Sequence, residues 1–480
     1  MLHARRATLA LLAALALLLG FVTPAQATED FFASDQATRP ANPDDATSEE
    51  LEAAAGGGFG TVTGRLFYQN RGSSVETPVS THFGGSVRFW RLDEEAGFWL
   101  LERSQNVNTS SFFTASELPA GNYRLEFRTR DNASLTAREY WNDQELFVEG
   151  DVLTLADGDL VELGNVVVTH STIESGRLAG NDRFETSVEI SRALSQVQGG
   201  IDVVYIVNGY GYADALSAGP AASAQGGGLL LTMPNSIPSV VAAELRRLEP
   251  NRIVVVGGTS AISANVERQL RGLVADGGSV ERIAGANRYE TSRRIVADAF
   301  PDGVDVLFAA TGNNFPDALA AGPIASIFGG AVLLLDGSAS RVDAPTRSLI
   351  DQLGQPEVAI VGGPNSVSYG VESSLLTSGV ASSVGRVQGA NRYETAMEIN
   401  RLYIFTEGMD VAFLATGEGF ADALAGGPLA AAMQSPIYLA QQNCMPWAAK
   451  YDIEYYFTKE LYALGGTSAL SNRALARGDC

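Results

Sequence analysis

Pairs of arginines recur at a fixed spacing along the second half of the chain. Arg177 and Arg183 lie six residues apart in the segment RLAGNDRFET, with Gly180 between them. A guanidinium presents a planar fork of N–H donors that matches a phosphate or carboxylate, and glycine allows a tight turn with close approach of the backbone. The segment returns as RIAGANRYET from Arg282 and as RVQGANRYET from Arg386. The same chemistry for binding an anion is therefore offered three times.

A second motif keeps the same step along the chain. Asp214, Asp317 and Asp422 each begin an Asp-Ala-Leu segment that ends in Gly-Pro. These aspartates lie where a strand should pass into a helix, the place at which open α/β sheets bind ligands and where a helix N-terminus attracts anions. A helix cap is the simpler role for such an aspartate. Both roles stay open on the sequence alone.

We predict three sites for an anion, each combining arginines, a threonine and an aspartate. The candidate residues are Arg177, Arg183, Thr186, Arg282, Arg288, Thr291, Arg386, Arg392, Thr395, Asp214, Asp317 and Asp422. The competing interpretation is structural: the second arginine of each pair, at positions 183, 288 and 392, would form ion pairs with neighbouring glutamates or with the three aspartates. Such pairs would fix the loop and leave no charge for a ligand.

Glycine pairs form the third repeated mark, at Gly257, Gly362 and Gly465 and the glycine after each. They follow apolar runs but lack both a G-x-G-x-x-G pattern and the lysine of a phosphate-binding loop, so we expect no nucleotide cofactor. The three histidines are isolated, and no His/Cys cluster indicates a metal or a nucleophile. We expect no catalysis and no metal, although the many carboxylates leave a glycosidase formally open.

The three marks together resemble the type 2 cell wall-binding repeat family of Gram-positive surface proteins, over residues 177–480. The first arginines are 105 and 104 residues apart, and a fixed period of this kind indicates repeated structural units. The resemblance implies three copies in a pseudo-threefold arrangement that hold a protein non-covalently on the wall by binding anionic polymers. It also implies a surface protein, with a wall hydrolase that uses the repeats for targeting as the alternative, and a surface-layer or adhesion role as a weaker third.

Within each copy, apolar runs alternate with amphipathic segments. Apolar runs at 202–207, 228–232 and 252–256 in the first copy suit buried parallel strands, and segments 188–194, 240–248 and 263–273 suit helices. This alternation predicts a Rossmann-like parallel α/β unit. We place the copies at 177–275, 276–380 and 381–480, with the arginine motif read as a loop.

The first part of the chain has a different organisation. Residues 1–27 have the charged start, apolar core and small-x-small end of a signal peptide, so we expect a secreted, wall-associated protein without a membrane span. Residues 28–58 are predicted to be a disordered acidic spacer. Residues 59–169 alternate with period two, which predicts an antiparallel β-sandwich. Its segment 118–127, LPAGNYRLEF, resembles the turn of transthyretin-like, carboxypeptidase-regulatory-like domains.

Charge limits the partners. The net charge is −22, of which residues 28–176 carry −15 and the three copies −9, and such acidity argues against nucleic acid. An anionic ligand then requires local basic clefts or bridging divalent cations. The two cysteines, Cys444 and Cys480, are predicted to form a disulfide in an oxidising compartment, with two free thiols as the alternative.

Overall fold

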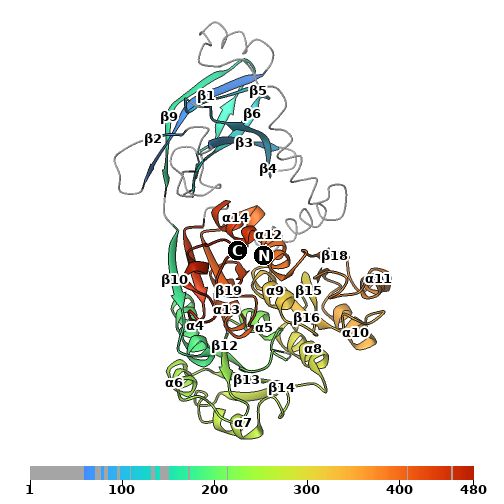
Figure 1. Ribbon diagram of the computed structural model, residues 1–480. Helices are drawn as coiled ribbons and strands as arrows, with labels where there is room; N and C mark the ends of the chain where they lie inside the picture. The colour runs from blue at the N-terminus through green and yellow to red at the C-terminus, as the bar shows by residue number, and fades with distance from the viewer. Residues whose placement is uncertain are drawn as a thin grey trace. The chain divides into compact units, whose positions relative to one another are not determined.

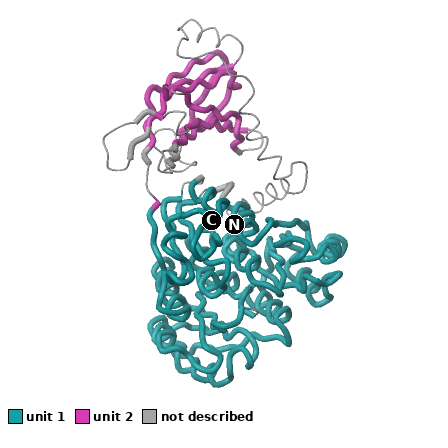
Figure 2. Tube along the Cα trace, in the orientation of Figure 1, with its two compact units in different colours: residues 1–23, 174–480 teal, residues 24–173 magenta. Residues whose placement is uncertain are grey.

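The computed structural model describes two compact units (Figure 1, Figure 2). The described residues are 59–70, 77–79, 85–93, 98–108, 110–130, 136–140, 151–170, 173–212, 214–407, 409–455 and 458–480. Those before residue 174 form one unit, and residues from Glu174 onward form the other. The predicted signal peptide and acidic spacer lie outside the described residues. No helix in the described part of the chain is long and apolar enough to cross a bilayer.

The first unit consists of two β-sheets around a shared core. One sheet contains β1 (Gly60–Asn70), β2 (Thr77–Pro78), β5 (Phe112–Leu118) and β9 (Leu160–His170), and the other contains β3 (Gly85–Asp93), β4 (Phe98–Asn106), β6 (Gly121–Arg130), β7 (Thr136–Tyr140) and β8 (Leu153–Leu155). Phe89, Phe113 and Phe127 lie in the core between them. The predicted antiparallel β region is confirmed, with β1 and β9 as a parallel exception.

The predicted turn before Tyr123 is present. The hydroxyl of Tyr123 donates to the carbonyl of Pro119 at 2.6 Å, and its ring is fully buried. Burial raises the pKa of Tyr123 to about 12. Tyr123 therefore ties the turn to the core, as the alternation of residues 118–127 predicts.

The second unit contains three parallel four-stranded sheets. The first sheet has the order β12 (Gly228–Thr232), β11 (Val203–Asn208), β13 (Arg252–Val256), β14 (Ser279–Ile283); the second β16 (Ala331–Leu335), β15 (Val306–Thr311), β17 (Glu357–Val361), β18 (Ser383–Val387); the third β20 (Ile437–Ala440), β19 (Val411–Thr416), β21 (Glu460–Leu464), β10 (Glu174–Leu178). Every pairing in these sheets is parallel. The predicted α/β fold is confirmed.

The fourth strand of each sheet comes from a different copy of the sequence repeat. β14 opens the second copy but pairs with β13 of the first, and β18 opens the third copy but pairs with β17 of the second. β10 opens the first copy and pairs with β21 near the end of the chain. The arginine motif thus starts on a strand, which corrects its reading as a loop. The three copies interlock, because each lends its first strand to a neighbour.

Helices connect the strands and cover the sheets. They are α4 (Arg183–Gln198), α5 (Ala218–Ala224), α6 (Ser239–Leu248), α7 (Ala264–Leu270), α8 (Arg288–Ala299), α9 (Pro316–Ile327), α10 (Ala344–Gln352), α11 (Tyr369–Ser378), α12 (Arg392–Glu407), α13 (Ala421–Ala432), α14 (Trp447–Tyr455) and α15 (Asn472–Leu475). α9 and α13 begin with the Asp-Ala-Leu motif and α5 follows it, and the three helices pack against one another in the middle of the unit (Figure 1). Their small residues, such as Gly322 beside Pro220, allow this close contact. The three central helices mark the pseudo-threefold axis.

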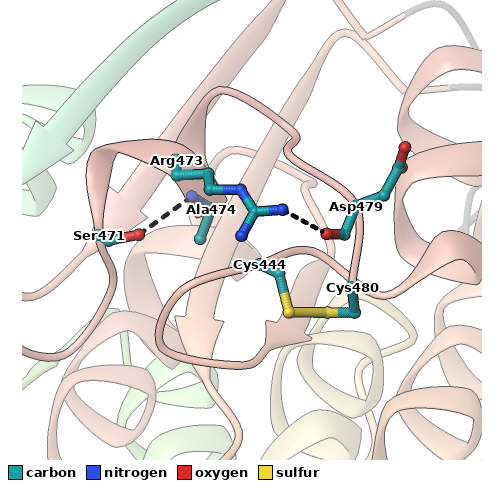
Figure 3. Close-up of a disulfide and its surroundings, with 6 residues drawn as sticks. All are labelled: Cys444, Ser471, Arg473, Ala474, Asp479 and Cys480. Carbon is teal, nitrogen blue, oxygen red and sulfur yellow. Dashed lines mark hydrogen bonds between the residues drawn. A yellow bond between two sulfur atoms is a disulfide. The ribbon is translucent and has the colours of Figure 1, made fainter.

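A disulfide closes the end of the chain. Cys444 and Cys480 are bonded, as predicted (Figure 3). The last residues also pair with the main chain at Met445, whose N–H donates to Gly478 and whose carbonyl accepts from Cys480. The disulfide thus fixes the C-terminal residue beside α14 and α15.

We expect replacement of both cysteines by serine to lower the free energy of unfolding by about 2 kcal/mol, since the bridge restricts a loop of 36 residues in the unfolded chain. Urea unfolding of the double variant, compared with the oxidised wild-type protein, measures this, and the reduced wild-type protein should unfold like the double variant. Equal stability of oxidised and reduced wild-type protein would contradict it.

Candidate functional site

The first arginine of each motif contacts a glycine pair of the preceding copy. The Nη1 atoms of Arg282, Arg386 and Arg177 donate to the carbonyls of Gly257, Gly362 and Gly465, each at 2.6 Å. These arginines lie on the lent strands β14, β18 and β10, so the strand pairing itself brings them to the glycines. Each arginine is partly buried.

The same glycines separate the arginines from the three aspartates. Gly257, Gly362 and Gly465 have φ values of +93°, +97° and +99°, in the left-handed region that favours glycine. A Cβ atom at any of these positions would collide with a carboxylate oxygen, that of Asp214, Asp317 or Asp422 respectively. The glycine pair therefore serves to place an aspartate beside a main-chain turn at the carboxyl ends of the strands.

The second arginine of each motif begins a helix and contacts the glycine after the next strand. Arg183 donates to the carbonyl of Gly209 at 2.6 Å, and Arg288 and Arg392 repeat the contact with Gly312 and Gly417. Asp182, Asn287 and Asn391 supply side-chain oxygens that accept from N–H groups of the first helical turn. The glutamate of the motif accepts from the main chain before the helix, as Glu185 does from Asn181 at 2.8 Å.

The aspartates of the second and third copies lie near the second arginine of the following copy, the third copy being followed by the first. Burial raises the pKa of Asp317, opposed by a hydrogen bond from Ser366 and by the charge of Arg392. Burial also raises the pKa of Asp422, opposed by the charge of Arg183. Each candidate site is thus assembled from two copies, which sequence reasoning missed.

We call these clusters boundary sites. The first contains Asp214, Arg282 and Arg288; the second Asp317, Arg386 and Arg392; the third Asp422, Arg177 and Arg183. The first copy meets the second here also through Tyr212, whose hydroxyl donates to the carbonyl of Asn313 at 3.2 Å. At the first boundary site a cavity of about 130 Å³ opens between the ends of β11 and β13, lined by Asn208, Gly211, Asp214, Val256 and Ala261 among others. This is the crevice at which such sheets bind ligands.

Three aromatic rings meet near the axis, one from each copy. The ring centroids of Tyr212, Phe315 and Phe420 are 5.4, 5.7 and 6.1 Å apart, and each side chain is partly exposed. Arg392 of the second boundary site lies 5.9 Å from the Phe315 ring. Each aromatic stands two residues before its aspartate, a repeated signal in the sequence that could have identified the trio.

The predicted site residues divide into two groups. Thr186, Thr291 and Thr395 are buried, and their hydroxyls accept from the N–H of Gly180, Gly285 and Gly389, so the threonines hold the turn. The arginines and aspartates gather at the boundary sites. The expected helix cap is absent at all three aspartates, since the N-cap residues of α5, α9 and α13 are Ser217, Phe315 and Phe420.

The arginines that form ion pairs are not the ones expected from the sequence. The second arginines bond to glycine carbonyls. The first arginines form the ion pairs in two copies, Arg282 with Glu267 at 2.8 Å and Arg386 with Glu372 at 2.6 Å. These glutamates lie outside the motif, on α7 and α11, each four residues after the serine that caps its helix.

Comparison with known proteins identifies the family to which the three copies belong. Cell wall binding domain 2 (CWB2) matches the chain three times, at residues 177–267, 282–372 and 386–475. The chain belongs to the CWB2 family. The three matches correspond to the three copies found in the sequence, and CWB2 repeats bind the cell wall. The protein is thus a cell wall-binding protein associated with the wall or the cell surface.

Curated relatives share the CWB2 region. N-acetylmuramoyl-L-alanine amidase LytC of Bacillus subtilis (strain 168) is 30% identical over 298 residues, which are 62% of this chain and 56% of LytC. An amidase enhancer of the same organism is 32% identical over 308 residues, 64% of this chain and 39% of the relative. The chain therefore spans about half or less of the length of these relatives.

Two solved structures share the fold. Cwp6 from Clostridium difficile has a TM-score of 0.58 at 23% identity, covering 82% of this chain and 63% of Cwp6. Cwp8 from the same organism has a TM-score of 0.55 at 23% identity, covering 74% of this chain and 58% of Cwp8. The likeness supports the fold of the CWB2 unit.

Proposed function

We propose that the protein is a secreted, non-catalytic surface protein, held on the wall by an anionic polymer that binds at the boundary sites. The observation that carries the proposal is the contact of a partly buried first arginine with a glycine turn of another copy, beside the aspartate of that copy. At the second and third sites the charge of the second arginine also acts on this aspartate. Guanidinium groups in such a partly desolvated cleft bind oxyanions more strongly than on an open surface.

Three sites on one unit suit a repeating ligand. Each site is small, and the copies together carry a net charge of −9, so one site alone should bind a polyanion weakly. Once one site engages, the next repeat of the polymer is held at high effective concentration near the second. In this role the β-sheet unit, residues 59–169, is the part displayed, and its resemblance to carboxypeptidase-regulatory-like domains remains a hypothesis.

Sedimentation with isolated cell wall tests the proposal. We expect the full-length mature chain to sediment with intact wall, and to stay in the supernatant when the anionic polymer has been removed from the same wall. Repeating the assay with a chelator separates direct binding by arginine from bridging by divalent cations. Equal sedimentation with intact and stripped wall would contradict an anionic ligand.

A second function is favoured by the relatives, because one of them is named as an amidase and another as an amidase enhancer. In that case the repeats would target a hydrolase to its substrate. The matched residues cover about 300 positions of this chain, which is the extent of the CWB2 copies. Release of soluble label from labelled peptidoglycan by the purified protein would favour the hydrolase over the proposed surface protein.

A further inference from the structure

We infer that the three boundary sites are unequal, and that the third boundary site, with Arg177 and Arg183, is the principal site for an oxyanion of the wall polymer. The inference rests on the proposed function and deepens it. The three motifs are nearly identical in sequence, yet the groups opposite their first arginines differ in charge.

Two of the first arginines already hold an internal carboxylate. Arg282 donates through Nε to Glu267 at 2.8 Å, and Arg386 donates through both Nε and Nη2 to Glu372, the latter at 2.6 Å. Their side chains are only 15% and 8% exposed. A ligand anion at either guanidinium would have to displace a glutamate that is already in place.

Arg177 has a neutral partner instead. Its Nη2 contacts the amide oxygen of Asn472 at 3.3 Å, and its Nη1 donates to the carbonyl of Gly465. Burial lowers the pKa of Arg177. Asn472 is exposed, so an incoming oxyanion can take its place beside the guanidinium without unpairing an internal charge.

A residue difference in the third copy explains why Arg177 lacks the glutamate. Glu267 and Glu372 each stand four residues after a serine that caps a helix, Ser263 or Ser368. The corresponding serine in the third copy is Ser471, and the residue four positions later is Leu475. Here the helix is cut to the short α15, and the chain turns into the disulfide-bonded tail (Figure 3).

Neighbouring charges do not restore the missing carboxylate. The carboxylate of Asp479 is paired with Lys450 at 2.8 Å, and Arg473 donates to the main-chain carbonyl of Asp479 (Figure 3). With the glutamates counted, the second boundary site holds two arginines and two carboxylates, and the first holds the same groups plus Arg271, which also pairs with Glu267 at 3.0 Å. The third holds two arginines and the single carboxylate of Asp422. It therefore carries one positive charge more than the second boundary site, and its first arginine faces the neutral Asn472 rather than a glutamate.

The ligand chemistry that fits is one oxyanion on a flexible glycan, either a phosphodiester or a carboxylate, approaching the fork of Arg177. A soluble poly(glycerol phosphate) and a soluble polygalacturonate are the two probes that distinguish these sources. Binding of each to the full-length mature protein is measured by calorimetry at low and at high salt, since screening weakens such contacts.

The test variant is Asn472→Asp, which keeps the side-chain shape and places a carboxylate beside Arg177. We expect affinity for the preferred probe to fall about tenfold or more at low salt, with a smaller difference at high salt. The matched control is Asn265→Asp, which adds the same charge on α7 beside Arg268 rather than beside a motif arginine. It should change affinity by less than about twofold.

A converse variant tests the other half of the inference. Glu372→Gln removes the carboxylate from Arg386 and should strengthen binding at least about threefold, or add a second bound equivalent. If Asn472→Asp binds like Asn265→Asp, or if Glu372→Gln weakens binding while the protein stays folded by circular dichroism, the sites are equivalent and the inference is wrong. If the wild-type protein binds neither probe nor intact wall, the proposed function itself fails.

Discussion

Replacement of Gly362 by alanine is expected to lower the free energy of unfolding by about 3 to 4 kcal/mol. A left-handed conformation costs a residue with a Cβ about 1 to 2 kcal/mol, and Gly362 has φ of +97°. The added methyl group also collides with the carboxylate of Asp317 and lies 3.0 Å from the Cβ of Ser366. Overpacking of this kind costs about 1 to 3 kcal/mol.

The neighbouring glycine supplies the control. A Cβ at Gly363 would meet only the end of the Gln388 side chain, at 3.3 Å. Gly363→Ala should therefore cost less than about 1 kcal/mol. Urea unfolding of the two variants measures the difference, and equal midpoints would show that the turn at Gly362 tolerates a side chain. Wall sedimentation of Gly362→Ala should also weaken, because Asp317 and the carbonyl that holds Arg386 must both move.

Replacement of Gly176 by proline is expected to cost about 3 kcal/mol and to release the strand that closes the third sheet. The N–H of Glu174 donates to Lys459, and the carbonyl of Leu178 accepts from Gly465. Gly176 lies midway between them in the ladder, so its N–H faces β21. Proline removes that donor, and a Cβ at this position would lie 2.5 Å from the ring of Tyr462.

Ser175→Pro is the matched control, because alternate N–H groups of an edge strand point away from the sheet. It should lower stability by less than about 1 kcal/mol. Thermal unfolding measures both effects, and hydrogen exchange of β21 should rise in Gly176→Pro but not in Ser175→Pro. Protection of β21 in both variants would mean that β10 contributes little to the third sheet.

Much of the fold follows from the sequence because its signals are local. The apolar runs before Gly257 and Gly362 predict buried parallel strands, and the structure has β13 and β17 there. The pairing of β14 with the preceding copy is not local. The alternating pattern of β14 would suit the edge strand of any of the three sheets. Only the packing of the three copies around the pseudo-threefold axis determines which sheet β14 joins. The copy limits drawn from the motifs therefore do not mark separate sheets.

The sequence predicted which charged residues belong to the candidate site. It did not predict that each site combines residues from two copies. Arg177 and Asp422 are distant in sequence, and only the closure of the third sheet by β10 brings them to one cluster. Glu267 and Glu372 could not be identified, because a glutamate on an amphipathic helix is ordinarily solvated. Tyr212, Phe315 and Phe420 were identifiable, since each stands at the same offset from its aspartate.

The first strand of each copy pairs in the sheet of another copy, and this also determines how many sites a chain of such copies can hold. A site needs the start of one copy and the end of another, so an open row of three copies would contain two complete sites. Here β10 joins β21 and makes the third from the two ends of the row. The circuit formed in this way has as many sites as copies. Loss or duplication of a single copy would consequently demand a new geometry for the whole circuit, rather than simply removing or adding one point of attachment.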